Sequence, residues 1–119
     1  MPAVIEAIER SRIIGIVRLP RYDQALEIAR ALLEGGIQVM EFTLTGAGAY
    51  HAISTVRTAL GESVQVGVGT VLEPGAVQGS LDAGAQFVVT PVTDPEVIAS
   101  CKLAHLPILC GALSVEAIR

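Results

Sequence analysis

The sequence predicts an α/β fold in which five parallel strands alternate with helices. Five short runs of β-branched and other apolar residues are separated by segments whose apolar positions have helical spacing. Connections of this length favour parallel pairing, and strands covered by helices on both faces carry nearly continuous apolar runs. The strands are expected at residues 12–19, 38–44, 64–71, 86–91 and 106–111.

The helices are predicted from their ends as well as from their spacing. The first spans residues 22–34, with Asp23 as a candidate cap and two glycines at its end. A second helix follows the next strand. Pro74 and Pro95 each follow an acidic residue and precede apolar positions at helical spacing, which is typical of proline in the first turn of a helix. Arg119 falls just inside a fifth helix.

A weak internal repeat supports this organisation. The segment "EGGIQVMEFT" begins at Glu34, and "DAGAQFVVTP", with a similar pattern, begins at Asp82, 48 residues later. Such a repeat predicts strand–helix units of constant size, which occur both in (β/α) barrels and in doubly wound open sheets. The periodicity alone does not distinguish the two.

Composition excludes several classes of function. With 51% hydrophobic residues, a chain of this length can bury one core, so residues 1–119 are expected to form one domain or part of one. A net charge of −4 with no basic stretch argues against nucleic-acid and membrane partners, and no run is long enough to span a bilayer. Cys101 and Cys110 fit reduced core residues, which favours a cytoplasmic protein without a metal site.

Ligands of parallel α/β sheets bind at the carboxyl ends of the strands. The candidate site residues at these ends are Arg18, Glu41, Thr43, Thr70, Thr90 and Pro91.

Glu41 is the unusual member of this set because it interrupts the apolar run "VMEFTL". Alternation along a strand places Glu41 and Thr43 on one face. Met40 and Phe42 lie on the other face, which must pack against helices. An ionised carboxylate buried without a partner is costly. Two explanations stay open: a structural ion pair with Arg18, or a glutamate whose raised pKa serves general acid and base catalysis.

Several motifs in combination resemble one family. The segments "GIVRL", "GGIQVMEFTLT", "VGVGTV", "AGAQFVVTP" and "LPILCGALSVEAI" resemble the 2-keto-3-deoxy-6-phosphogluconate and 4-hydroxy-2-oxoglutarate aldolases over almost the whole chain. The resemblance implies a TIM-type (β/α) barrel, usually trimeric, that cleaves a 2-keto acid to pyruvate and an aldehyde through a Schiff base. It implies neither a metal nor an organic cofactor. The chain is then an incomplete barrel, the amino-terminal part of the (β/α)8 fold.

The resemblance also implies roles for individual residues. Glu41 corresponds to the proton-shuttling glutamate and Thr70 to a threonine that contacts pyruvate. Arg18 and Pro91 line the same pocket, and Thr43 is assigned to substrate binding with them. A guanidinium and a neutral hydroxyl suit the carboxylate of a keto acid.

Two departures from the family pattern bear on function. Many relatives have an arginine at the position of Thr45, so its absence puts recognition of the substrate carboxylate or phosphate in question. The Schiff-base lysine of the family lies on a sixth strand, whereas the only lysine here is Lys102, expected on the outer surface of a helix. A lysine there lacks the desolvation that makes an amine nucleophilic.

Two hypotheses therefore remain. The chain is an aldolase whose 119 residues are inactive alone, or it is a non-catalytic remnant that binds a keto acid or anion, or serves as an assembly module. An open sheet edge predicts a homo-oligomer in either case.

The segment "GVGTV" resembles a phosphate loop but lacks its lysine, so close packing within a strand explains its glycines. The turn "TGAG", which precedes a helix, is a weaker anion candidate.

Overall fold

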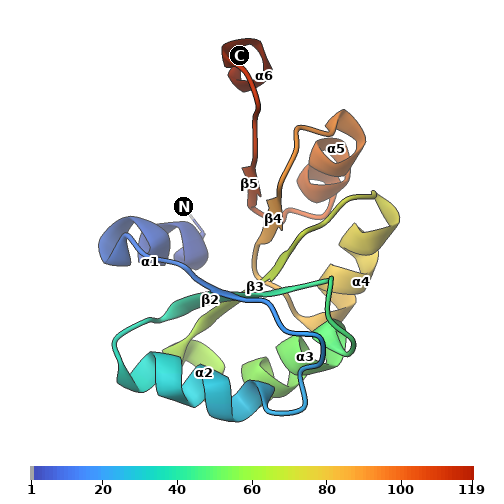
Figure 1. The fold of residues 1–119 in the computed structure, drawn as a ribbon. Coiled ribbons are helices and arrows are strands. Elements are labelled where there is room, and N and C mark those ends of the chain that lie inside the picture. Colours follow the sequence, from blue (N-terminus) through green and yellow to red (C-terminus); the bar gives the residue numbers. More distant parts are fainter. Residues whose placement is uncertain (1) are drawn as a thin grey trace.

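The computed structural model describes residues 2–119, which form a curved sheet of five parallel strands with helices on both sides (Figure 1). Neighbouring strands follow the order of the sequence, β1-β2-β3-β4-β5, and every pair is parallel. This arrangement confirms the predicted fold class. The strands are β1 (Gly15–Val17), β2 (Val39–Thr43), β3 (Gln65–Gly69), β4 (Val88–Thr90) and β5 (Ile108–Cys110).

Helices α2 to α5 cover the convex side of the sheet and α1 lies on its concave side (Figure 1). All crossovers between consecutive strands thus run on one side, as in a barrel. The short helix α6 follows β5 and projects away from the sheet (Figure 1). The helices are α1 (Ala3–Ser11), α2 (Ala25–Glu34), α3 (Ala49–Leu60), the 3-10 turn η1 (Gly61–Ser63), α4 (Gly75–Ala83), α5 (Pro95–Leu103) and α6 (Val115–Ile118).

The sequence patterns did not predict α1. Val4 and Ala7 of this helix are buried in a small cluster with Val39 and Phe87. Val39 stands on the same strand face as Glu41, so α1 covers the concave side of the sheet near the amino end of β2.

The first predicted helix starts later than expected. It begins at Ala25 after Gln24, and no side chain caps it. Asp23 is exposed and instead forms a 3.7 Å ion pair with Arg21, so the predicted Asp23 cap is wrong. Pro95 does occupy the first turn of α5, where Asp94 accepts a 2.9 Å hydrogen bond from the backbone N–H of Glu96.

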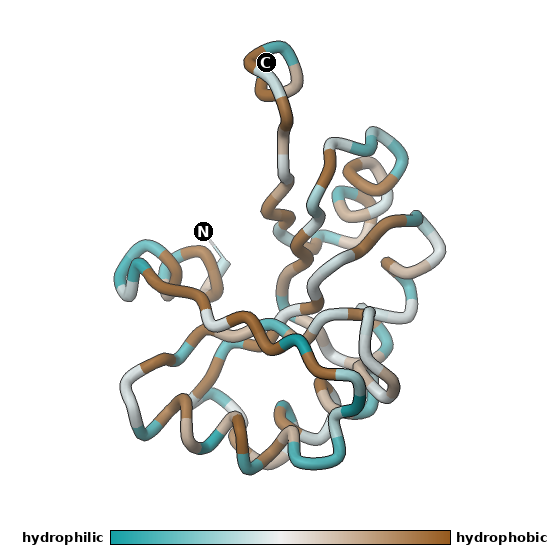
Figure 2. The backbone as a smooth tube through the Cα atoms, viewed as in Figure 1, coloured by the Kyte–Doolittle hydropathy of each residue, from teal (hydrophilic) through white to brown (hydrophobic). Residues whose placement is uncertain are grey.

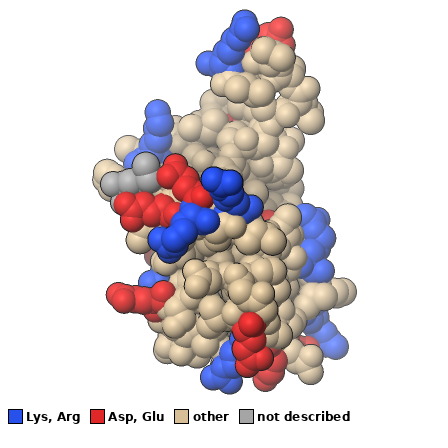
Figure 3. Space-filling model, turned by 90° about the vertical axis from the view of Figure 1, so that its left-hand side faces the viewer, with Lys and Arg blue, Asp and Glu red and all other residues tan. Residues whose placement is uncertain are grey.

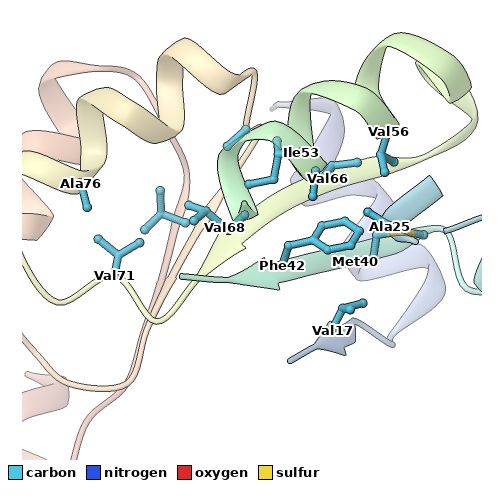
Figure 4. Packing of buried hydrophobic residues seen from close by; sticks show 14 of the residues in the cluster. Val17, Ala25, Met40, Phe42, Ile53, Val56, Val66, Val68, Val71 and Ala76 are labelled. Atoms are coloured by element: carbon cyan, nitrogen blue, oxygen red, sulfur yellow. The ribbon is translucent and has the colours of Figure 1, made fainter. Parts of the chain in front are cut away.

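The main core lies between the sheet and the outer helices. Met40 and Phe42 are fully buried there against α2 and α3, which confirms the predicted face of β2 (Figure 4). Hydrophobic residues are concentrated along the strands and recur along the helices (Figure 2). This burial supplies the main stabilisation of the fold and leaves the opposite face of β2 for Glu41.

The internal repeat corresponds to a repeated helix end. Gly36 and Gly84, two residues into each copy, have φ of 95° and 94°. The residues that follow them donate matching hydrogen bonds, from Ile37 N–H to the Leu32 carbonyl at 2.8 Å and from Ala85 N–H to the Ser80 carbonyl at 3.0 Å. Both are Schellman ends, in which a left-handed residue closes the helix before the next strand.

A third such end follows α5, with His105 as its left-handed residue. His105 has a φ of 57°, and Leu106 N–H donates to the Cys101 carbonyl at 2.9 Å. The geometry matches that at Gly36 and Gly84, but a histidine occupies the position that glycine favours. This helix end therefore also occurs at the junction of α5 and β5, although the sequence repeat does not extend there.

Candidate functional site

Glu41 lies in the middle of β2, and 3% of its surface is exposed. Burial raises its pKa from 4.5 to about 7, and the nearby positive charge of Arg18 lowers the pKa by a smaller amount. The Oε2 atom is buried and has no hydrogen-bond partner. The side chain is therefore a buried carboxyl group that can be protonated or ionised near neutral pH.

Arg18 and Glu41 form no direct ion pair. The only ion pair within residues 2–119 joins Arg21 to Asp23, so the structural ion pair considered for Glu41 is not formed. Arg18, the first residue after β1, instead donates from Nη2 to the Thr70 hydroxyl at 3.3 Å. Its charge acts on Glu41 across a longer distance.

Thr70 is the first residue after β3 and has a φ of 60°. A β-branched residue seldom adopts this left-handed conformation, so the surrounding structure must hold it there. The end of β3 thus turns abruptly at the residue that meets Arg18.

Thr43, at the end of β2, is fully buried, and its hydroxyl is already hydrogen bonded. The Oγ1 atom lies 3.0 Å from the Tyr22 hydroxyl and 2.7 Å from Thr45 Oγ1. Both polar contacts of the Thr43 hydroxyl are therefore made within the protein. A depression of about 280 Å³ opens beside Thr43 at the ends of β2 and β3. Its lining comprises Leu44, Thr45, Thr70, Leu72, Glu73 and Ala76.

The remaining candidates lie farther along the sheet. Pro91 is exposed after β4, two strands from Glu41, and Gly111 packs against its carbonyl group. The hydroxyl of Thr90 donates to the Val92 carbonyl at 2.9 Å, so it serves the local turn. The structure thus places Arg18 within hydrogen-bond distance of Thr70 and close enough to act on the pKa of Glu41. It leaves Pro91 two strands away from Glu41.

Two residues of this site were not assigned from the sequence. Gly69 gives space to the Glu41 carboxylate, because a Cβ at Gly69 would lie 2.7 Å from Glu41 Cδ. Gly67 similarly gives space to the Phe87 ring, which confirms close packing as the reason for the glycines of "GVGTV". Tyr22 is the second residue, and its buried hydroxyl contacts the ends of both β1 and β2.

Other features define the surroundings of the site. Lys102 is exposed on α5, which lies on the convex side of the sheet (Figure 1). Within residues 2–119, no three His, Cys, Asp or Glu side chains are grouped to hold a metal ion. No helix in this range has both the length and the apolar character to cross a membrane. On the face shown in Figure 3, acidic and basic side chains are interspersed.

Comparison with known proteins gives a consistent relationship. A curated 2-dehydro-3-deoxy-phosphogluconate aldolase from Treponema pallidum is 42% identical over 118 residues, which are 99% of this chain and 56% of that protein. The Pseudomonas aeruginosa protein of the same name is 33% identical over 110 residues, 91% of this chain and 49% of its own length. The chain thus spans about half the length of the curated relatives it matches.

Solved structures agree with the sequence comparison. A KDPG aldolase from Legionella pneumophila, solved with pyruvate as a covalent carbinolamine intermediate, superposes with a TM-score of 0.84 at 30% identity. The match covers 91% of this chain and 52% of that one. The family model described as KDPG and KHG aldolase matches residues 4–119. The chain therefore belongs to the KDPG and KHG aldolase family.

Proposed function

We propose that this chain supplies the acid–base and keto-acid-binding part of an aldolase. The reaction cleaves a 2-keto-3-deoxy-phosphosugar acid or 4-hydroxy-2-oxoglutarate to pyruvate and an aldehyde. The observation that carries the proposal is Glu41, a buried carboxyl group with a pKa of about 7 and an oxygen atom without a partner. An acid–base catalyst works best when its pKa is near the working pH.

In such a reaction an amine attacks the keto carbon, and the carbonyl oxygen leaves as water after it receives protons. The C4 hydroxyl then loses its proton and the C3–C4 bond breaks, with its electrons passing into the iminium group to give an enamine. Protonation of the enamine carbon and hydrolysis release pyruvate. Glu41 serves these proton transfers because it can give up and regain a proton at Oε2 near neutral pH.

Arg18 and Thr70 suit the carboxylate of the keto acid. The Thr70 hydroxyl accepts from Arg18, which leaves its own hydrogen free for an anionic oxygen. Arg18 adds positive charge and further N–H donors, and such charge-assisted bonds are stronger than neutral ones. In this assignment Thr43 shapes the wall beside them and Pro91 forms the rim.

The nucleophilic amine is the group that residues 2–119 do not place at this site. Lys102 is exposed on α5, on the convex side of the sheet, and an amine there lacks the buried surroundings of a Schiff-base lysine. We therefore expect the 119-residue chain by itself to form no Schiff base and to have no significant retro-aldol activity. We assign it to a cytoplasmic homo-oligomer, in keeping with its exposed apolar residues near both edges of the sheet.

Complementation tests this proposal. The chain is mixed with the carboxyl-terminal part of the Treponema pallidum relative, and pyruvate release from 2-keto-3-deoxy-6-phosphogluconate and 4-hydroxy-2-oxoglutarate is measured. We expect activity only in the mixture, with a loss of at least about a hundredfold in Glu41→Gln. Activity that is indifferent to Glu41→Gln would contradict the role of this residue.

Borohydride trapping with pyruvate separates catalysis from simple binding. The chain alone should give no covalent adduct, and the mixture should give one. An adduct of the chain alone that disappears in Lys102→Ala would make Lys102 the nucleophile and overturn this part of the proposal. Reversible pyruvate binding without any complementation would favour the non-catalytic keto-acid-binding remnant.

A further inference from the structure

The Tyr22 hydroxyl lies where the pairing of β1 with β2 ends. The last paired residues are Val17 and Phe42. The Tyr22 oxygen lies 3.0 Å from the Val17 carbonyl and 2.7 Å from the Thr43 carbonyl, so it contacts both strands just beyond this pair. Arg18 is the first residue after β1, and its backbone is not paired with β2.

The direction of these hydrogen bonds follows from counting hydrogens. A phenol has one hydrogen and carbonyl oxygens can only accept, so the Tyr22 hydrogen is shared between the two carbonyls. The Thr43 hydroxyl must then donate to the Tyr22 oxygen, at 3.0 Å, and the Thr45 hydroxyl donates to Thr43, at 2.7 Å. The network joins two strand ends through one phenol.

The Tyr22 ring is itself held by packing on two sides. It meets Phe42 edge to face, with centroids 5.6 Å apart. On another side, a Cβ at Gly46 would lie 2.6 Å from the ring, so only glycine fits there. The residue after Gly46, Ala47, donates a hydrogen bond from its backbone N–H to the Pro20 carbonyl at 2.9 Å. The hydroxyl is therefore presented to the two carbonyls by a fixed ring.

We propose that Tyr22 is a positioning residue for Arg18: its hydroxyl holds the end of β1 against β2 and thereby keeps the Arg18 guanidinium at Thr70. The 3.3 Å contact between Arg18 and Thr70 spans from β1 to the end of β3, so a shift of the β1 end would break it. This inference rests on the proposed role of Arg18 in binding the keto acid, which it deepens.

The test uses Glu41 as a reporter of the position of Arg18. On β3, Gly67 pairs with Glu41 and Gly69 lies against its carboxylate, and Arg18 is the charged group that acts on its pKa. The Glu41 carboxyl is titrated by ¹³C NMR in the 119-residue chain and is assigned with Glu41→Gln. Arg18→Gln should raise the pKa by removing the positive charge. Tyr22→Phe, which keeps the ring, should raise it by at least about half as much.

Tyr50→Phe is the matched control. The Tyr50 hydroxyl also donates to a carbonyl, that of Ala76 at 3.2 Å, but it lies on α3, away from β1. Its removal should leave the Glu41 pKa unchanged. An unchanged pKa in Tyr22→Phe would show that Tyr22 only packs, and would overturn the proposal. A fall toward about 4.3, the value of an unfolded chain, would show that the hydroxyl holds the whole fold and would also overturn it.

Pyruvate binding separates this inference from the proposed function. Titration with pyruvate should show binding weakened about three- to tenfold in Tyr22→Phe, as expected for the loss of a positioned contact. If pyruvate does not bind the wild-type chain but the Glu41 pKa responds as predicted, the keto-acid role fails and the positioning role stands. If pyruvate binds equally well to both while the pKa is unchanged, the positioning role fails alone.

Discussion

The carboxylate of Glu41 occupies the space that a side chain at Gly69 would fill. An ideal Cβ at Gly69 would lie 2.7 Å from Glu41 Cδ and 2.8 Å from Oε1. Gly69 lies on β3 and pairs with Thr43, which follows Glu41 by two residues on β2. The Glu41 carboxylate therefore leans toward the carboxyl end of the sheet. The glycine thus lets a buried acid reach toward the strand ends, where Arg18 and Thr70 meet.

Glu41→Gln should change how stability depends on pH. The pKa of Glu41 is about 7 in the folded protein, above its value in the unfolded chain, so the folded state binds the proton more tightly. The resulting stabilisation is fully present below about pH 4.5 and is lost as the pH rises through 7. Between pH 4 and 8 the wild type should therefore lose about 3 kcal/mol relative to Glu41→Gln.

Urea denaturation of both proteins at several pH values measures this difference. The two unfolding free energies should converge at pH 4, since a protonated glutamate and a glutamine are similar in size and polarity. A constant difference across this range would mean that Glu41 titrates at the same pH in the folded and unfolded chains.

Gly69→Ala should destabilise the protein through its contact with Glu41. The added methyl group overlaps the carboxylate, and overpacking of this kind costs about 1–3 kcal/mol. The cost should be smaller when Glu41→Ala is also present, because the overlapping group is then absent. A double-mutant cycle measures this coupling.

Gly67→Ala provides the matched control for that cycle. Its methyl group would lie 2.5 Å from the Phe87 ring and has no overlap with Glu41. It should destabilise by a similar amount, and Glu41→Ala should not relieve it. Relief of both glycine variants to the same extent would show a general loosening of the sheet rather than a specific contact.

The features predicted correctly from the sequence are those that local alternation determines. The apolar residues around Glu41 had to face the helices, so the opposite face of β2 was assigned to this glutamate with no knowledge of its neighbours. The parallel class followed in the same way from the spacing of apolar runs. The 3.3 Å contact between Arg18 and Thr70 joins residues 52 positions apart, and only the order of the strands brings them together.

The errors have equally specific causes. Helix α1 has neither of the usual end signals, because Pro2 gives no side-chain cap and the helix closes at Arg12, a non-glycine residue with a φ of 59°. Asp23 has the residue type of a cap, but the preceding Tyr22 is held in the core by its hydroxyl and ring, and α2 begins two residues later, at Ala25. Missing local signals account for the first error, and the tertiary contacts of Tyr22 account for the second.

His105→Gly should stabilise the protein. His105 has a φ of 57° at the end of α5, in the position that Gly36 and Gly84 occupy after α2 and α4. A left-handed conformation costs a non-glycine residue about 1–2 kcal/mol, which the greater freedom of glycine in the unfolded chain partly offsets. The net gain should be a few tenths to about 1 kcal/mol, measured by thermal or urea denaturation.

Gly36→Ala is the reciprocal experiment. A Cβ at Gly36 would meet no atom within 4 Å, so any loss of stability comes from the backbone conformation alone. It should be destabilising by about 1 kcal/mol. Stabilisation by both substitutions, or by neither, would contradict the equivalence of the three helix ends.

Self-association should depend on the open edge of the sheet at β1. Strands β1 and β5 are the two edges, each hydrogen bonded to one neighbour, and Ile16 of β1 is 64% exposed. An unpaired edge with an exposed apolar residue favours pairing with another chain, and lysine on an edge strand opposes it. Sedimentation velocity should therefore show association of the wild type that Ile16→Lys reduces.

Leu103→Lys is the control, because Leu103 is 85% exposed but lies on α5, outside the sheet. Equal effects of the two substitutions would move the interface to the outer helices, and a wild type that is monomeric at every concentration would refute association through β1.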